Sequence, residues 1–206
     1  MPGLQIQSRE TVARSQRSRL IEAMAESCAE RGLAAATISD IVARAGMGRA
    51  TFYKLFEGKD ECFRAAVNEV VGDLSRAIGT AVAEGEEWPV TVRRVFEAVT
   101  EILADRPAFA QLAFLESRAV DLELLEPYRN AFFALIETGP PGDSPFPADS
   151  EQSAQLVYGQ VQAMFIAAGV AGTVEDLPEQ IPTLAYLAML PGLGPEAAAR
   201  EARLRA

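Results

Sequence analysis

The chain lacks histidine altogether, although it is 206 residues long. This absence excludes Ser-His-Asp triads, zinc sites that need an imidazole ligand and the Glu-x-x-His motif of di-iron bundles. Cysteine is scarce as well, because Cys28 and Cys62, 34 residues apart, are the two that the chain has. Their spacing matches neither a metal nor a redox motif. Both lie on apolar helical stripes, so we expect buried thiols, and we predict no metal site and no cofactor.

Sequence patterns of enzymes are missing too. No candidate nucleophile has a histidine base, and acidic pairs such as Glu86-Glu87 are typical of solvated helix ends. The fragment Gly192-Leu193-Gly194 lacks the preceding strand and the third glycine of a dinucleotide site. We therefore predict that the protein is not an enzyme.

The N-terminus does not resemble a signal peptide, and we expect no apolar run to be long enough to span a bilayer. Apolar residues make up 49% of the chain, so disorder is not expected overall. These observations predict a folded cytoplasmic protein with enough chain for one domain or two small ones.

Negative charge dominates the chain, but it is unevenly distributed. The net charge is −10, yet residues 1–54 hold eight Arg and Lys against five Asp and Glu. That segment therefore carries +3, and the other 152 residues carry −13. An acidic body would repel nucleic acid and leave a basic N-terminal surface to face it.

The fold class follows from the apolar pattern, because apolar residues recur every three or four positions and strand-like alternation is absent. This predicts an all-α protein whose first ten residues are polar and mobile. The loop at residues 138–150 is predicted from its four prolines and two glycines. Helices are expected at about residues 11–31, 37–45, 48–56, 59–82, 92–103, 107–114, 121–137, 151–170, 178–190 and 195–206.

The segment from Thr37 to Phe63 is the most informative about function. It predicts two short helices joined by a turn at Gly46, then an aromatic and basic patch, then a further helix. Thr37 is a good N-cap, with Asp40 at the N3 position of a capping box. This layout is typical of a helix-turn-helix, which places its second helix in the DNA major groove.

The same segment resembles the DNA-binding domain of the tetracycline-repressor (TetR/AcrR) family. The resemblance is residue-specific over about 27 positions, while the helical layout is similar over the whole chain. The matching residues, spaced without a gap, are Thr37, Ile38, Ile41, Ala43, Ala45, Gly46, Thr51, Tyr53, Phe56, Lys59 and Phe63.

This resemblance implies an N-terminal helix-turn-helix DNA-binding domain at residues 1–58 and an effector-binding and dimerisation domain at residues 59–206. It implies a ligand-responsive transcriptional regulator, a repressor that binds a palindromic operator as a homodimer and is released by a small effector. The alternative is a helical adaptor whose basic residues are merely solvated, without sequence-specific DNA binding.

Roles in DNA binding follow from chemistry and position within the helix-turn-helix. Arg49, near the start of the second helix, can bind a guanine through two hydrogen bonds. Gly48 stands where many relatives have a serine or threonine, so it caps that helix without a side-chain contact. Phosphate contacts are predicted for Thr37, Lys54 and Lys59, and Tyr53 resembles the family's phosphate-contacting tyrosine. Ala50 and Thr51 are small enough to let the second helix approach the DNA, and Thr51 can also touch a thymine methyl or a phosphate. Arg44 is predicted to add positive charge on the first helix.

For the body, the resemblance implies a pocket whose effector shifts the helix that begins near Lys59. Its aromatic candidates predict an apolar or aromatic effector, although aromatics at helical spacing are also typical of a core. Acidic residues at 97, 101 and 116 can meet a cationic ligand or simply be solvated. The candidate pocket residues are Trp88, Phe96, Phe109, Phe114, Tyr128, Phe132 and Phe165.

The homodimer is predicted through the helices at residues 151–170 and 178–190, in a four-helix interface. Its two recognition helices must then lie about one DNA turn apart, ~34–36 Å. Small residues would let the helices approach, and larger ones would complete the contact. The residues in question are Gly159, Ala163, Ala167, Ala168 and Gly169, with Tyr158, Leu184, Leu187 and Met189.

Overall fold

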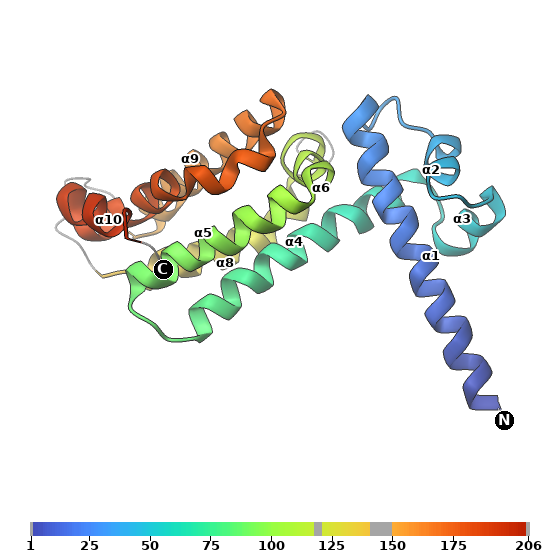
Figure 1. Ribbon diagram of the computed structural model, residues 1–206, viewed down its shortest axis with the longest axis horizontal. Coiled ribbons are helices and arrows are strands. Elements are labelled where there is room, and N and C mark those ends of the chain that lie inside the picture. The colour runs from blue at the N-terminus through green and yellow to red at the C-terminus, as the bar shows by residue number, and fades with distance from the viewer. Residues whose placement is uncertain (1, 118–120, 141–149, 205–206) are drawn as a thin grey trace. The chain divides into compact units, whose positions relative to one another are not determined.

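The computed structural model of the chain describes residues 2–117, 121–140 and 150–204. Within these ranges the secondary structure is helical and contains no strand, so the all-α prediction is confirmed (Figure 1). The chain forms two compact units, Met1–Glu69 and Val70–Ala206. The functional boundary between residues 58 and 59 stays a prediction.

The N-terminal unit contains three helices and the first part of a fourth. These are α1 (Pro2–Arg31), α2 (Ile38–Arg44), α3 (Arg49–Leu55) and the start of α4 (Lys59–Ala83). The helix expected from residue 11 begins earlier, at Pro2, while the mobility predicted for the first ten residues stays a prediction. Proline is well tolerated at the first helical position, and residues 4–10 contain neither proline nor glycine.

Apolar side chains from all four helices form the core of this unit. Cys28 and Cys62 are both buried, which confirms the prediction of buried thiols. Burial raises the pKa of the Cys62 thiol to about 12. The largest buried core residues are Leu20, Ile21, Met24, Ile41, Phe52 and Phe63.

A tight turn at Gly46 joins α2 to α3. The Gly46 N–H donates to the Ala43 carbonyl at 3.1 Å, and the Met47 N–H donates to the Val42 carbonyl at 2.8 Å. These two bonds form a Schellman motif, which places the glycine in the left-handed region at φ +64°. The predicted glycine turn is therefore present, and its geometry sets the direction in which α3 leaves α2.

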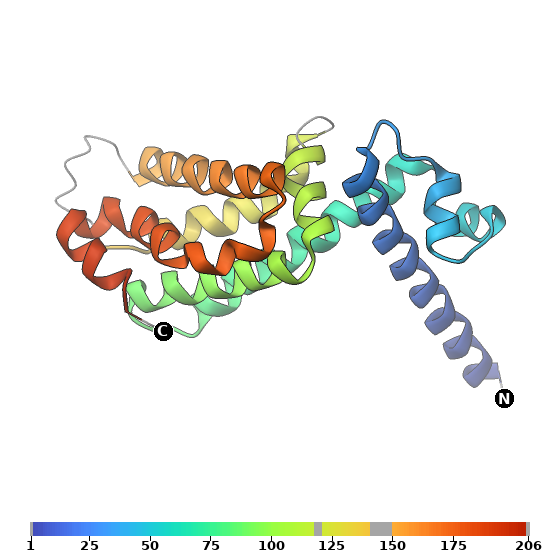
Figure 2. The same ribbon diagram turned by 45° about the horizontal axis from the view of Figure 1, so that its top comes forward.

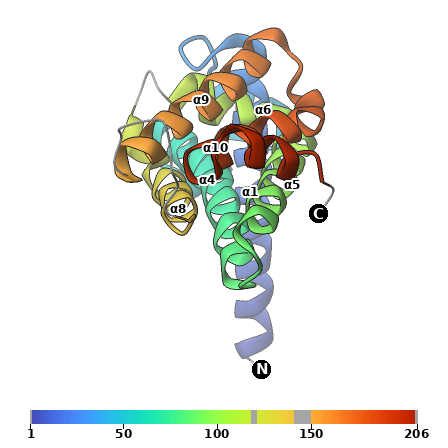
Figure 3. The same cartoon turned by 90° about the vertical axis from the view of Figure 1, so that its left-hand side faces the viewer.

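The C-terminal unit is a bundle in which α5 packs against η3 and α10, while α8 packs against α9 (Figures 1 and 2). Figure 3 shows these helices from the end of the bundle. Besides the rest of α4, its elements are α5 (Trp88–Asp105), α6 (Pro107–Gln111), η1 (Leu112–Glu116), η2 (Leu122–Leu125), α8 (Glu126–Glu137), α9 (Ser150–Ala171), η3 (Val174–Gln180) and α10 (Ile181–Glu201).

Several boundaries in this unit differ from the predicted ones. The helix opened by Pro107 continues into a π-helical turn at η1, and the helix expected from residue 121 starts as the 3₁₀ turn η2. The helices expected at 178–190 and 195–206 are joined in α10, where Gly194 marks a kink at φ 71°. Residues 141–149 of the predicted loop lie outside the described residues.

Helix α9 corrects the expectation that no apolar run is long enough to span a membrane. Among the helices of the described residues, only α9, over residues Glu151–Ala171, is long and apolar enough to cross a membrane, by length and composition alone. Its inner side chains, including Val161 and Phe165, are buried in the C-terminal unit. Leu156 and Val170 on the outside are exposed, so the helix is apolar on two faces.

We expect Gly46→Ala to lower the free energy of unfolding by about 1–2 kcal/mol, because only glycine adopts the left-handed region without penalty. A Cβ at this position would also lie 3.1 Å from an Arg19 guanidinium nitrogen. Gly79→Ala is the matched control, since it adds a methyl in open space within α4 and should stabilise by about 0.5–1 kcal/mol. Urea unfolding followed by circular dichroism measures both, and equal effects at the two sites would contradict the assigned turn.

Candidate nucleic-acid interface

The exposed face of α3 carries polar and basic side chains, and its opposite face buries two aromatic side chains. Phe52 is fully buried and Phe56 is 2% exposed, with their ring centroids 5.6 Å apart. The opposite face carries Arg49, Tyr53 and Lys54, all exposed, and the Tyr53 side chain is 57% exposed. This helix can therefore offer two cations and a phenol to a ligand outside the protein.

Arg49 occupies the first position of α3, and its guanidinium donates a hydrogen bond to the Ser39 hydroxyl of α2. Both side chains are exposed, so this bond holds the arginine at the surface without removing it from solvent. Ser39 was not among the predicted site residues. Ser39 lies ten positions before Arg49, and no local sequence pattern predicts a contact between residues so far apart.

The start of α3 is open. Gly48 is its N-cap at φ −91°; among the residues that the structure describes, no side chain caps the helix here and a Cβ would meet no atom within 4 Å. Ala50 is exposed beside Arg49, and Thr51 is half-buried. The small residues thus leave this end of the helix accessible to a large partner.

Thr37 forms the predicted capping box with Asp40. Its hydroxyl donates to the Asp40 carboxylate at 2.6 Å and accepts from the Asp40 N–H at 3.2 Å. The Thr37 N–H also donates to this carboxylate, at 3.0 Å. These bonds lower the pKa of the Asp40 carboxyl. A phosphate contact would use the Thr37 N–H and hydroxyl as donors. In the free protein both of them already donate to the Asp40 carboxylate.

Arg44 bridges two helices. Its guanidinium binds the carboxylates of Glu30 and Glu26 on α1, and these hydrogen bonds raise the pKa of Arg44. The glutamates stand four positions apart on one helix, a like-charge pair that is unfavourable without a cation between them. The spacing of Glu26 and Glu30 is therefore a sequence signal for a cation such as Arg44. The prediction of Arg44 as a DNA contact did not take this signal into account.

Lys59 fastens the start of α4 to the loop before α2. Its ammonium donates to the Leu33 carbonyl at 2.8 Å and to the Ala36 carbonyl at 3.0 Å. The side chain is half-buried there. The carbonyls lie 26 and 23 residues earlier in the chain, so no local pattern predicts the contact. Lys59 thus has a structural role in addition to the phosphate contact predicted for it.

In the C-terminal unit, six of the seven predicted pocket residues form part of a packed aromatic core. Phe114 lies 5.2 Å from Phe165 and 6.1 Å from Tyr128, measured between ring centroids. Burial raises the pKa of the Tyr128 hydroxyl well above its ordinary value. An effector among these rings would have to move them. The six, each at most 2% exposed, are Phe96, Phe109, Phe114, Tyr128, Phe132 and Phe165.

Trp88 has a different environment from the other six. Its indole N–H donates to the Leu135 carbonyl at 2.8 Å, and a Cβ on Gly139 would lie 2.6 Å from its ring. Trp88 thus fastens the start of α5 to the end of α8. Of the acidic candidates, Glu101 is exposed, whereas Glu97 and Glu116 are half-buried.

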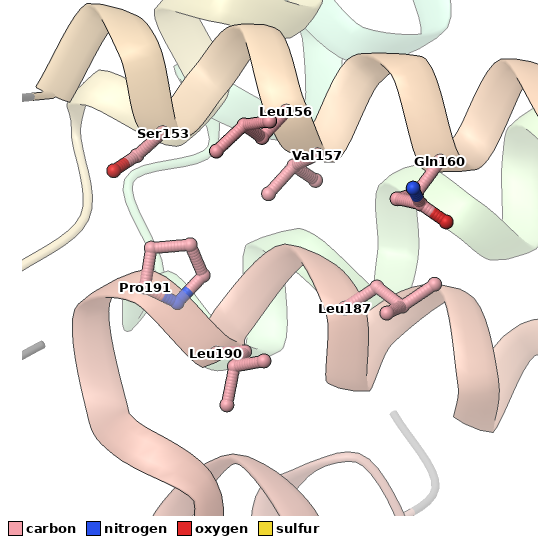
Figure 4. Close-up of a pocket in the computed structure, with 7 residues that line it drawn as sticks. All are labelled: Ser153, Leu156, Val157, Gln160, Leu187, Leu190 and Pro191. Carbon is pink, nitrogen blue, oxygen red and sulfur yellow. The ribbon is translucent and has the colours of Figure 1, made fainter. Parts of the chain in front are cut away.

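An apolar groove of about 260 Å³ lies between α9 and α10 (Figure 4). Leu156 and Leu187 face it from opposite helices. Gly159, Ala163 and Ala167 are exposed. The groove is lined by Ser153, Leu156, Val157, Gln160, Leu187, Leu190 and Pro191.

Four residues predicted for the dimer interface have their main contacts inside the unit instead. Leu184 and Met189 are fully buried in its core, because α10 packs that side against the bundle. Gly169 is buried against Leu115, and the Tyr158 ring contacts Phe132 at 5.8 Å. Ala168 is half-buried.

Comparisons with known proteins agree with this architecture. Residues 20–66 match the family described as bacterial regulatory proteins, tetR family. A segment of 73 residues is 37% identical to the HTH-type transcriptional regulator BetI 1 of Chromohalobacter salexigens, and it covers 35% of this chain and 36% of that protein. The chain thus spans about a third of the length of this curated relative.

Two solved structures have a similar fold over most of the chain. The fatty acid degradation regulator FadR of Bacillus halodurans has a TM-score of 0.73 and 20% identity, covering 84% of this chain and 97% of that one. FadR of Bacillus subtilis, in complex with stearoyl-CoA, has a TM-score of 0.71 and 21% identity, covering 86% and 98%. Residues 20–66 thus carry the helix-turn-helix of the tetR family of bacterial regulatory proteins, inside a fold that is similar to that of the two FadR regulators.

Proposed function

We propose that the protein is a transcriptional repressor that binds a palindromic DNA operator as a homodimer and is released by a small apolar or aromatic effector. The observation that carries the proposal is the exposed face of α3, where Arg49, Tyr53 and Lys54 stand over a buried Phe52. A helix held in this way can enter a major groove with its polar face toward the bases.

The side chains of this face differ in the part of the DNA that each can reach. Arg49 lies at the N-terminal end of α3, where recognition helices contact base edges, and its guanidinium matches the two acceptors of guanine. Tyr53 and Lys54 lie one turn further along and suit phosphate oxygens. Arg49 thus supplies sequence selectivity, whereas Tyr53 and Lys54 supply affinity and orientation.

The N-terminus of α2 is a second phosphate contact, which forms only if Thr37 gives up its present hydrogen bonds. Thr37 must exchange the Asp40 carboxylate for a phosphate oxygen, since both of its donors bind that carboxylate in the free protein. Arg44 and Lys59 act mainly by holding α2 and α4 in place. An ammonium has three donors, so Lys59 keeps one for a phosphate after bonding two carbonyls.

The dimer is proposed through the outer faces of α9 and α10. On α9, exposed positions recur with helical spacing at residues 156, 159, 163, 167 and 170. Leu156 is 57% exposed and Val170 is 74% exposed. A second copy that laid its helices over this stripe would remove both from water and fill the groove beside Leu187 (Figure 4).

The effector is proposed to be apolar because the C-terminal unit is rich in buried rings. The stearoyl-CoA bound by FadR of Bacillus subtilis supports a ligand with a large apolar part. Release from DNA then requires that the effector binds better to a dimer whose two heads are wrongly spaced.

Selection of bound sequences from a random DNA pool tests the proposed function. We expect recovery of a palindrome whose half-site centres are about one DNA turn apart. Recovery of no consensus, together with binding that does not weaken as salt rises, would instead indicate the helical adaptor.

We expect Arg49→Ala to cost about 1–3 kcal/mol of operator affinity and to relax the preference at one base pair. Lys54→Ala is the matched variant, because it removes an exposed cation one turn away on the same helix. It should weaken all sequences alike and lower the salt slope by about one. Titration of operator and scrambled DNA at several salt concentrations measures both; identical, sequence-independent losses would refute the assigned roles.

We expect Gly48→Ser to tighten operator binding and to raise the stability of the N-terminal unit by a few tenths of a kcal/mol. The added hydroxyl caps α3 and faces the phosphate, and the space around this glycine accepts it. Gly48→Ala is the control, since it adds a Cβ without a hydrogen bond. Affinity for the selected operator gives the answer, and tighter binding by the alanine variant would contradict the explanation.

We expect Leu156→Glu to convert the dimer to a monomer at micromolar concentration, because the interface would bury an unpaired carboxylate. Leu204→Glu is the control, at a leucine that is 52% exposed and outside the stripe. Sedimentation velocity reads the association state directly. A wild-type monomer, or a Leu156→Glu dimer, would rule out this face.

A further inference from the structure

Gln162 is a buried polar residue on the inner side of α9. The residue is 4% exposed, and neither its Oε1 nor its Nε2 has a partner among the described residues. Both ends of the carboxamide are unpaired, so turning the amide over would not satisfy it. Buried polar groups are almost always paired, so one that has no partner within the protein is satisfied by an ordered water or by a bound ligand.

A cavity of about 200 Å³ adjoins this side chain. It lies between η2, α8 and α9, on the opposite side of α9 from the groove that Gln160 lines. A cavity of about 150 Å³ already holds one six-membered ring. The lining residues are Leu122, Leu125, Glu126, Arg129, Tyr158 and Gln162.

The charges at this cavity favour a neutral occupant. The Arg129 guanidinium binds the Glu126 carboxylate at 3.2 Å, so the cation beside the cavity is already compensated. A carboxylate ligand would place anionic oxygens near Glu126 and give Gln162 Oε1 no donor. An apolar ligand would leave both ends of the amide unpaired. The remaining class of ligand is neutral and presents one hydrogen-bond donor and one acceptor side by side.

We propose that this cavity binds a neutral cyclic amide, a lactam, as the effector of the proposed regulator. Such a ring is apolar except for its one amide group, so this proposal narrows the apolar effector proposed above to a ring with a single paired donor and acceptor. The lactam carbonyl accepts from the Gln162 Nε2–H, and the lactam N–H donates to Oε1 in a paired arrangement. The ring methylenes pack against Leu122 and Leu125, which form an apolar wall. This inference rests on the proposed function for its regulatory meaning, but the binding site itself does not.

The site is placed where a ligand can act on the dimer. Tyr158 lines the cavity, and its ring contacts Tyr128 at 5.9 Å and Phe133 at 5.8 Å on α8. An occupant therefore fixes how α9 sits against α8. The other face of α9 carries Leu156 and the groove residues, so a shift of this helix is passed to the proposed dimer contact.

The test uses the full-length protein with three probes of similar size: ε-caprolactam, N-methylcaprolactam and cyclohexanecarboxylate. Calorimetry and thermal unfolding measure binding. We expect saturable binding of caprolactam and at least tenfold weaker binding of its N-methyl analogue, which lacks the N–H donor. Equal binding of these two, preferential binding of the carboxylate, or no binding of any probe would overturn the proposal. The last result would mean that water alone fills the cavity.

Gln162→Met is the diagnostic variant, with Gln155→Met as the same change at an exposed position of α9. We expect the first to unfold at a higher temperature, since it removes an unpaired amide, and to lose caprolactam binding at least tenfold. The second should keep the wild-type affinity. Retained binding by Gln162→Met would refute the site, and the wild-type probe comparison decides the matter even if this variant fails to fold.

Operator binding separates this inference from the proposed function. Caprolactam that binds and lowers affinity for the selected operator supports both. Selective operator binding without any lactam binding overturns the cavity proposal alone. Lactam binding that depends on Gln162, in a protein that selects no DNA sequence, overturns the repressor and leaves the ligand site in place.

Discussion

The burial of Phe52 beneath α3 decides which side chains of that helix face outward. A helix of seven residues is far too short to be stable by itself, so its orientation depends on packing. Phe52 and Phe56 supply that packing, and Arg17 adds a cation over the Phe56 ring at 5.2 Å. With the aromatic face fixed, the helical period leaves residues 49, 50, 53 and 54 exposed. The proposed DNA surface is thus a consequence of core packing.

The cations of the N-terminal unit are divided between holding this arrangement and facing solvent. Arg44 joins α2 to α1 through two carboxylates, and Lys59 joins α4 to the preceding loop through two carbonyls. Arg49 and Lys54 remain exposed on α3. A count of positive charge would treat these four alike. Their bonds show that two of them define the geometry in which the other two can act.

The local parts of this site were predictable from sequence because their causes are local. The capping box needs a threonine and an aspartate three positions apart, and the turn needs a glycine at its left-handed position. The partners of Lys59 and Arg49 are distant in sequence, so they were not predictable. The π-helical turn at η1 also has no signal in the apolar spacing, because its five residues are too few to show a period of their own.

The two apolar faces of α9 explain both its resemblance to a membrane span in composition and its central place in the proposed regulation. A helix that packs on one side and is solvated on the other would not resemble a membrane span in composition. Here the inner face meets α8 and holds the unpaired Gln162, while the outer face carries exposed Leu156. A rigid helix moves both faces together. A ligand on the inner face can therefore alter the proposed dimer contact only by the difference in its affinity for two positions of α9. A hydrogen bond to the Gln162 amide that forms in only one of these positions would supply that difference.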